Sequence, residues 1–147
     1  MEKIREINKV WYNTANYQHD EESTKIHFIY PLFEALGWNL TTDMKKEINR
    51  IDCVLYWNNK PYIGVEAKSL RTRLIEEDTE KEKYNTTFNK NRLLNNCRNI
   101  GIKWAVVTSY VETLVFDVEN EKKVTFYKHP NEYEKRFYDL KILKKPS

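Results

Sequence analysis

The chain has 147 residues, of which 40% are hydrophobic, 32% are charged and 14% are aromatic, and its formal net charge is +3. This length suits one domain with its own core, and the aromatic content excludes a disordered chain. The mildly basic charge is compatible with a nucleic-acid partner but excludes a histone-like binder.

The N-terminal third is predicted to be helical. Apolar residues at near-helical spacing indicate a first helix over residues 2–17. A second helix is expected to begin after Asp20, which can cap it, and to run to about Leu36, with Gly37 ending it. Pro31 interrupts the backbone hydrogen bonding and is expected to kink this helix. The apolar positions of its buried stripe are Ile26, Ile29, Phe33 and Leu36.

From Ile48 onward the pattern changes to that of strands. Residues 51–57 and 62–67 are rich in β-branched and aromatic side chains, with a turn at 58–60 between them. A long charged helix is expected at about 74–98, and a short helix after Pro130. Helices before, within and after a small mixed sheet indicate an α/β or α+β domain. Further strands are expected at 104–108, 113–118 and 123–127.

The strongest candidate for a chemical site lies on the two strands around the 58–60 turn. Strand alternation places Glu66 and Lys68 on the same face as Gly64. Asp52 interrupts the apolar run of the preceding strand. A three-residue loop, 58–60, would pair Asp52 with Glu66, whereas a two-residue loop would place Asp52 opposite Val65, on the wrong face.

Two facing carboxylates repel each other, and a hard divalent cation such as Mg²⁺ neutralises them. Lys68 could then orient a water or stabilise the charge that develops on a phosphoryl group. The simpler alternative is a solvated face on which Glu66 and Lys68 only form an ion pair.

The flanking sequence resembles the PD-(D/E)XK nuclease superfamily, and in particular the N-terminal nuclease domain of type I restriction enzyme R subunits. The resemblance covers residues 20 to 140. It is carried by Glu22-Ser23-Thr24, by 30–38 (Tyr-Pro-Leu-Phe-Glu-Ala-Leu-Gly-Trp), 50–55 (Arg-Ile-Asp-Cys-Val-Leu), 60–70 (Lys-Pro-Tyr-Ile-Gly-Val-Glu-Ala-Lys-Ser-Leu), 103–108 (Lys-Trp-Ala-Val-Val-Thr) and 114–117 (Leu-Val-Phe-Asp).

The resemblance implies a restriction-endonuclease-like α/β fold: a three-layer α/β/α core with a mixed sheet of four to five strands, in a single domain over residues 1–147. It also implies a Mg²⁺-dependent DNA endonuclease, with Mn²⁺ able to substitute, in the cytoplasm. No apolar run is long enough to span a membrane, so we expect no membrane partner.

The resemblance also implies a role for each site residue. Asp52, Glu66 and Lys68 are the expected catalytic residues, and Glu22, Asp52 and Glu66 the expected metal ligands. Glu22 lies four and seven positions before Ile26 and Ile29, on the expected buried stripe, which makes Glu21 the weaker choice. The residues expected to bind DNA are Lys25, Arg71, Arg73, Lys90 and Arg92.

The sequence departs from the family at two helix positions. Arg92 and Asn96 stand where such domains often carry Gln and Tyr, although Arg92 could contact a phosphate instead. There is also no Gly-rich P-loop for a motor. Besides DNA, the expected partners are a separate motor or specificity protein, or a second copy of the chain, because cutting both strands commonly needs two sites. A non-catalytic DNA-binding or assembly module that retains the fold is the alternative function.

Overall fold

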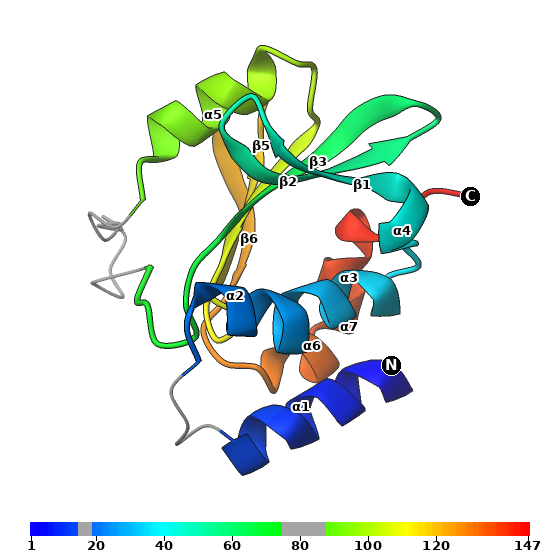
Figure 1. Cartoon of the computed structure of the whole chain (residues 1–147), viewed down its shortest axis with the longest axis vertical. Coiled ribbons are helices and arrows are strands. Elements are labelled where there is room, and N and C mark those ends of the chain that lie inside the picture. Colours follow the sequence, from blue (N-terminus) through cyan, green and yellow to red (C-terminus); the bar gives the residue numbers. More distant parts are fainter. Residues whose placement is uncertain (15–18, 75–87) are drawn as a thin grey trace.

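The computed structural model describes residues 1–14, 19–74 and 88–147. It contains a six-stranded sheet in the order β1-β2-β3-β4-β5-β6 (Figure 1). β3 and β4 are parallel, and every other neighbouring pair is antiparallel. The α/β prediction is confirmed. The strands are β1 (Met44–Ile48), β2 (Ile51–Trp57), β3 (Lys60–Ala67), β4 (Trp104–Thr108), β5 (Thr113–Asp117) and β6 (Lys122–Tyr127).

The prediction of four to five strands is wrong because it misses β1. This strand has the sequence Met-Lys-Lys-Glu-Ile, and its three central residues are exposed. It lies at the edge of the sheet, where charged side chains prevent pairing with another chain. The alternation of apolar and polar residues that identifies a half-buried strand is therefore missing from it.

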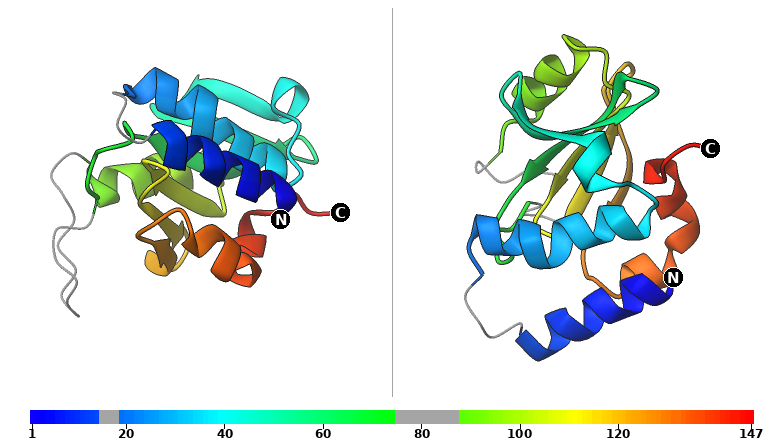
Figure 2. Two further views of the ribbon diagram at one scale, coloured as in Figure 1. Left: turned by 90° about the horizontal axis from the view of Figure 1, so that it is seen from below. Right: turned by 45° about the vertical axis from the view of Figure 1, so that its right-hand side comes forward.

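Helices cover both faces of the sheet (Figures 1 and 2). One face packs against the N-terminal helices and the C-terminal helices, and the other packs against α5 alone among the described helices. The helical elements are α1 (Glu2–Thr14), α2 (Glu21–Thr24), the π-helical turn η1 (Lys25–Ile29), α3 (Tyr30–Ala35), α4 (Leu40–Asp43), α5 (Lys90–Arg98), α6 (Glu132–Lys135), α7 (Phe137–Leu140) and the 3₁₀ turn η2 (Lys141–Leu143).

The helix predicted from Asp20 to Leu36 is present, but η1 replaces its middle. Asp20 caps α2 by accepting a hydrogen bond from the Ser23 N–H (2.7 Å). Within η1 the Tyr30 N–H donates to the Lys25 carbonyl, five residues back. The wider π turn shifts the phase of the side chains around the helix axis. Ile26 is therefore 53% exposed, and its assignment to the buried stripe is wrong.

The long helix predicted at 74–98 is shorter within the described residues. α5 begins at Lys90, and the Asn89 side chain caps it by accepting a hydrogen bond from the Arg92 N–H (3.0 Å). Residues 75–87 lie outside the described residues, as do residues 15–18 at the end of the first predicted helix. The short helix predicted after Pro130 is confirmed as α6.

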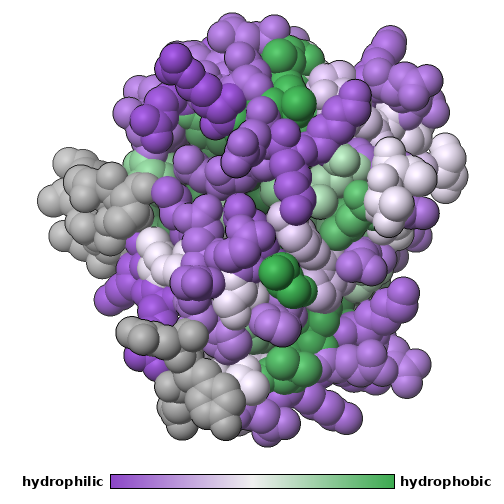
Figure 3. All heavy atoms as spheres, in the orientation of Figure 1, coloured by the Kyte–Doolittle hydropathy of each residue, from purple (hydrophilic) through white to green (hydrophobic). Residues whose placement is uncertain are grey.

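The surface seen in Figure 3 is mainly hydrophilic, with small, separate hydrophobic patches. No helix in the part of the chain that the structure describes has both the length and the apolar character needed to cross a membrane.

Candidate active site

The turn between β2 and β3 decides which residues face each other. Trp57 pairs with Lys60, so the turn contains two residues, Asn58 and Asn59. Both have positive φ (51° and 62°), as in the tight turns that match the twist of antiparallel strands. The prediction of a three-residue loop is therefore wrong.

A bulge between Leu55 and Tyr56 nevertheless restores the predicted register further along. Because the bulge leaves one extra residue, Tyr62, unpaired on β3, Val54 pairs with Gly64 as predicted. The same register, continued by two residues, places Asp52 opposite Glu66. The observed pairs around the bulge are Trp57 with Lys60, Tyr56 with Pro61 (predicted: Tyr62), Leu55 with Ile63 and Val54 with Gly64.

Asp52 is tied to the backbone of β3. Its Oδ2 accepts a hydrogen bond from the Ala67 N–H (2.9 Å). This bond orients one carboxylate at the end of β3, beside Glu66. Asp52 therefore has a structural contact as well as a position from which it could bind a cation.

Glu66 is the unusual carboxylate of the pair. Its Oε2 is buried and has no hydrogen-bond partner among the described residues. Burial raises the pKa of Glu66 above its usual value, Lys68 offsets part of the rise, and the Asp52 carboxylate adds to it. A buried carboxylate oxygen without a donor is costly, and a cation at this position would remove that cost.

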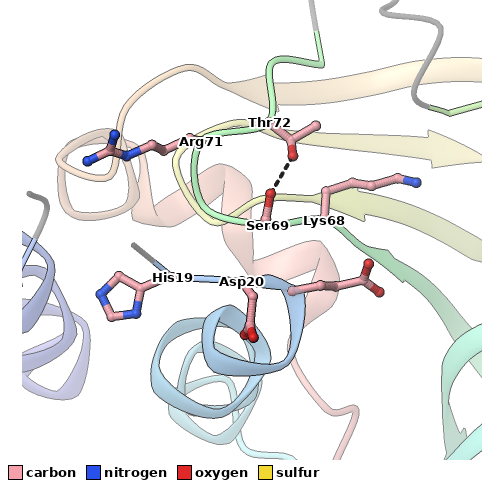
Figure 4. A pocket seen from close by; sticks show the side chains of 7 residues that line it. His19, Asp20, Lys68, Ser69, Arg71 and Thr72 are labelled. Atoms are coloured by element: carbon pink, nitrogen blue, oxygen red, sulfur yellow. Dashed lines mark hydrogen bonds between the residues drawn. The ribbon is translucent and has the colours of Figure 1, made fainter. Parts of the chain in front are cut away.

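Lys68 follows β3 and lines an open cleft of about 750 Å³. Its N–H donates to the Thr108 carbonyl (2.8 Å), which continues the pairing of β3 with β4. Figure 4 shows Lys68 at one end of the cleft and Arg71 with His19 toward the other. Its lining residues are His19, Asp20, Glu21, Lys68, Ser69, Arg71 and Thr72.

Thr24 joins the two walls of this cleft. Its hydroxyl is buried, accepts a hydrogen bond from the Leu70 N–H (2.9 Å) and donates to the Asp20 carbonyl (2.7 Å). The first turn of α2 is thereby fixed against the segment that follows β3. This bond sets where the acidic side chains of α2 lie relative to Lys68.

The two glutamates of α2 are placed differently from the prediction. Glu21 lines the cleft with Lys68, and its charge contributes to the raised pKa of Glu66. The Glu22 side chain is 63% exposed, and the buried stripe on which its choice depended does not include Ile26. The structure therefore brings Glu21 toward Glu66, while the ligand role of Glu22 stays a prediction.

The basic residues predicted to bind DNA do not form one group. Arg71 lines the cleft, and Arg92 is exposed and near enough to Glu66 to act on its pKa. Arg73 lines a second cleft, of about 330 Å³ beside Trp11, and Arg71 lines this one too. The remaining two lie elsewhere: the Lys90 ammonium is over the Phe116 ring (5.4 Å), and Lys25 is among acidic side chains.

The fit of a divalent cation can be judged from the donors. Within the described ranges, no three His, Cys, Asp or Glu side chains form a group that could hold a metal, so the predicted set of Glu22, Asp52 and Glu66 is not assembled. Mg²⁺, however, commonly takes one or two protein carboxylates and completes its shell with water and phosphate oxygens. Asp52 and Glu66, with the unpaired Glu66 oxygen, fit that requirement.

Sequence reasoning missed two features of the site. The first is the position of Glu21, which could have been found only by anticipating the π turn next to Pro31. The second is the environment of Lys25, which was predicted to bind DNA but has a side chain only 15% exposed, beside Glu21 and Glu22. No pattern in the sequence separates this lysine from the many on the surface.

Comparisons with known proteins bear on the fold. No protein-family model matches the chain, and no curated protein gives a significant match. Among solved structures, the chain is similar to a fragment described as an HsdR subunit of a type I restriction enzyme from Vibrio vulnificus YJ016, with a TM-score of 0.54 and 18% identity. The alignment covers 84% of this chain and 26% of that chain, so this chain spans about a quarter of its length. The two chains share a fold.

Proposed function

We propose that the protein is a Mg²⁺-dependent nuclease that hydrolyses phosphodiester bonds of DNA, related to the nuclease domain of type I restriction enzyme R subunits. The observation that carries this proposal is the buried, unpaired Glu66 oxygen opposite Asp52, at the edge of a cleft that Lys68 lines. The shared fold with an HsdR fragment supports it.

In this proposal Asp52 and Glu66 hold Mg²⁺, and Mn²⁺ can replace it. The bound ion supplies a Lewis acid for the phosphodiester oxygens. Of the two carboxylates, Glu66 is stabilised more by the bound cation, because burial disfavours its charge in the free protein. Asp52 keeps its hydrogen bond to the Ala67 N–H, which fixes the position of its carboxylate.

Lys68 acts on the reacting group. The backbone bond to Thr108 fixes the main chain of Lys68 at the end of β3, and its ammonium is near enough to Glu66 to oppose the rise in the pKa of that carboxyl. From there it stabilises the negative charge that develops on the phosphoryl oxygens. Arg71 lines the same cleft and the charge of Arg92 acts on Glu66, and we propose that both arginines bind neighbouring phosphates of the DNA.

The alternative is a non-catalytic module that binds DNA or assembles with a motor or specificity protein. The placement of Arg92 favours it, because Arg92 acts on Glu66 and stands where related domains often carry a glutamine. An arginine there could neutralise Glu66 in place of a metal.

A cleavage assay on plasmid and branched DNA, run together with calorimetric Mg²⁺ titration, tests the proposal. We expect Lys68→Ala to keep Mg²⁺ binding and lose cleavage by on the order of a hundredfold or more. Asp52→Asn and Glu66→Gln should lose both Mg²⁺ binding and cleavage. Asn is the better replacement for Asp52, because its amide oxygen can still accept the Ala67 hydrogen bond. Wild-type protein that binds DNA but neither Mg²⁺ nor Mn²⁺ would favour the non-catalytic module.

A further inference from the structure

Lys25 occupies an unusual position for a lysine. Its side chain is only 15% exposed, and its Nζ lies 3.5 Å from Glu22 Oε2 and 3.8 Å from Glu21 Oε1. Lysines are rarely buried to this degree unless their charge is paired. The burial of Lys25 therefore indicates that its ammonium is paired with the acidic groups around it.

The charge of Lys25 also acts on the candidate metal ligands. Burial tends to lower the pKa of Lys25, but the carboxylates of Glu22, Asp52 and Glu21 outweigh it, so the pKa is raised. Asp52 belongs to β2, so the influence of Lys25 extends beyond the two glutamates on its own helix. Lys25 is thus ion-paired with the two glutamates of α2, and its charge also acts on one ligand of the proposed site, Asp52.

The π turn explains how this lysine reaches the site. Lys25 is the first residue of η1, directly before the turn widens. π-helical turns inside α-helices occur often at functional sites, because the inserted residue redirects side chains. Here the adjoining residue Ile26 points outward, 53% exposed, while the Lys25 side chain is turned inward.

We propose that Lys25 is the internal cation of the metal-free site, which neutralises Glu21, Glu22 and Asp52 and competes with the divalent metal for them. This inference rests on the proposed function. A bound divalent ion next to Asp52 repels the Lys25 ammonium, so the protein must weaken its own ion pairs to take up metal. The free protein remains stable without metal, at the expense of metal affinity.

The rival explanation is an ordinary pair of helix contacts between a lysine and glutamates three and four residues away. Such pairs stabilise a helix only slightly and have no influence on a distant ligand. The two explanations differ in their effect on metal affinity, which only the proposal expects to change.

Metal titration of three variants distinguishes them. Mn²⁺ binding, followed by electron paramagnetic resonance of the free ion, is measured for wild type, Lys25→Met and Lys25→Arg at low salt. We expect Lys25→Met to bind Mn²⁺ about tenfold more tightly, because it removes one repelling charge that acts on the ligand Asp52. Lys25→Arg keeps the charge and should stay near the wild-type affinity. The control is Lys144→Met, which removes the same charge from an exposed position near the C-terminus and should leave the affinity unchanged.

Thermal unfolding gives a second readout. In EDTA, Lys25→Met should melt at a lower temperature than wild type, and Mn²⁺ should raise its melting temperature by more than it raises that of wild type. A lower melting temperature combined with unchanged or weaker Mn²⁺ affinity would overturn the role of Lys25 and leave the proposed function intact. Absence of Mn²⁺ and Mg²⁺ binding in wild type and in Lys25→Met would overturn both.

Discussion

At Gly64 the α5 side chain Cys97 packs tightly against the sheet, and replacing Gly64 with alanine tests that packing. A Cβ at this position would stand 2.7 Å from Cys97 Sγ, 3.1 Å from Ile102 Cδ1 and 3.5 Å from Ile51 Cγ2. All three neighbours are buried, so none can turn into solvent to make room. We expect Gly64→Ala to lower the free energy of unfolding by about 1–3 kcal/mol, as overpacked cores do. This loss should outweigh the ~0.5–1 kcal/mol that alanine otherwise gains over glycine within a strand.

The shortest of these contacts also provides a rescue. Cys97→Ala removes the sulfur atom and leaves an ordinary van der Waals contact with Ile51 (3.5 Å) and a tight one with Ile102 Cδ1 (3.1 Å), which a small shift of that terminal methyl group relieves. The double variant should therefore be more stable than the sum of the two single changes predicts. We expect a coupling free energy of about 1 kcal/mol or more, as for residues in direct contact.

Urea unfolding of the four proteins in this cycle measures the coupling, provided that the m-values agree. Thermal unfolding should give shifts of about 2–4 °C for each kcal/mol in a protein of this size. Gly64→Ala with wild-type stability would refute the close approach of α5. A destabilised Gly64→Ala that Cys97→Ala does not rescue would show that the cost has another origin.

Two further predictions concern buried polar groups. Burial raises the pKa of Glu66 above its ordinary value of 4.5 in the folded protein, so Glu66 favours folding below pH 4.5 and loses that contribution as the pH rises through its folded pKa. Glu66→Gln should therefore be more stable than metal-free wild type at pH 7–8. Urea midpoints of the two proteins that keep the same difference from pH 4 to pH 8 would contradict this. Asn8 is buried, accepts a hydrogen bond from the Tyr110 hydroxyl and donates one to the Pro130 carbonyl (3.1 Å). Asn8→Ala should lower the free energy of unfolding, measured in urea, by about 1–3 kcal/mol. The control Arg5→Ala, which breaks an exposed ion pair on the same helix, should lower it by less than about 1 kcal/mol.

Much of the sheet could be predicted because its central strands are apolar on both faces. The predicted strand at 104–108 is β4 with the same bounds, and β2 covers residues 51–57 as predicted. Both lie between helices, so burial required a dense run of β-branched residues. β1 could not be predicted for the opposite reason, because an exposed edge strand has no need of such residues.

The candidate site was predicted by an argument that was only partly correct. Asp52 lies opposite Glu66, but a two-residue turn and a bulge produce this register instead of a three-residue loop. A bulge depends on how a strand twists against its neighbours, and the local sequence carries little signal for it. The same limitation applies to the π turn, which moved Ile26 outward and left Glu22 largely exposed.

The energetics of the carboxylate pair bear on the choice between nuclease and non-catalytic module. Asp52 satisfies one of its oxygens with a backbone N–H, whereas Glu66 leaves a buried oxygen without a donor. A glutamine at position 66 would have nearly the same shape without the charge that burial disfavours, so a module that only binds DNA would gain stability from that change. A cation that binds at this position during function would offset the free-energy cost of the buried Glu66 charge. Glu66→Gln therefore tests whether the destabilising acid is kept for metal binding. If it is, the variant should gain stability at neutral pH and lose metal affinity together.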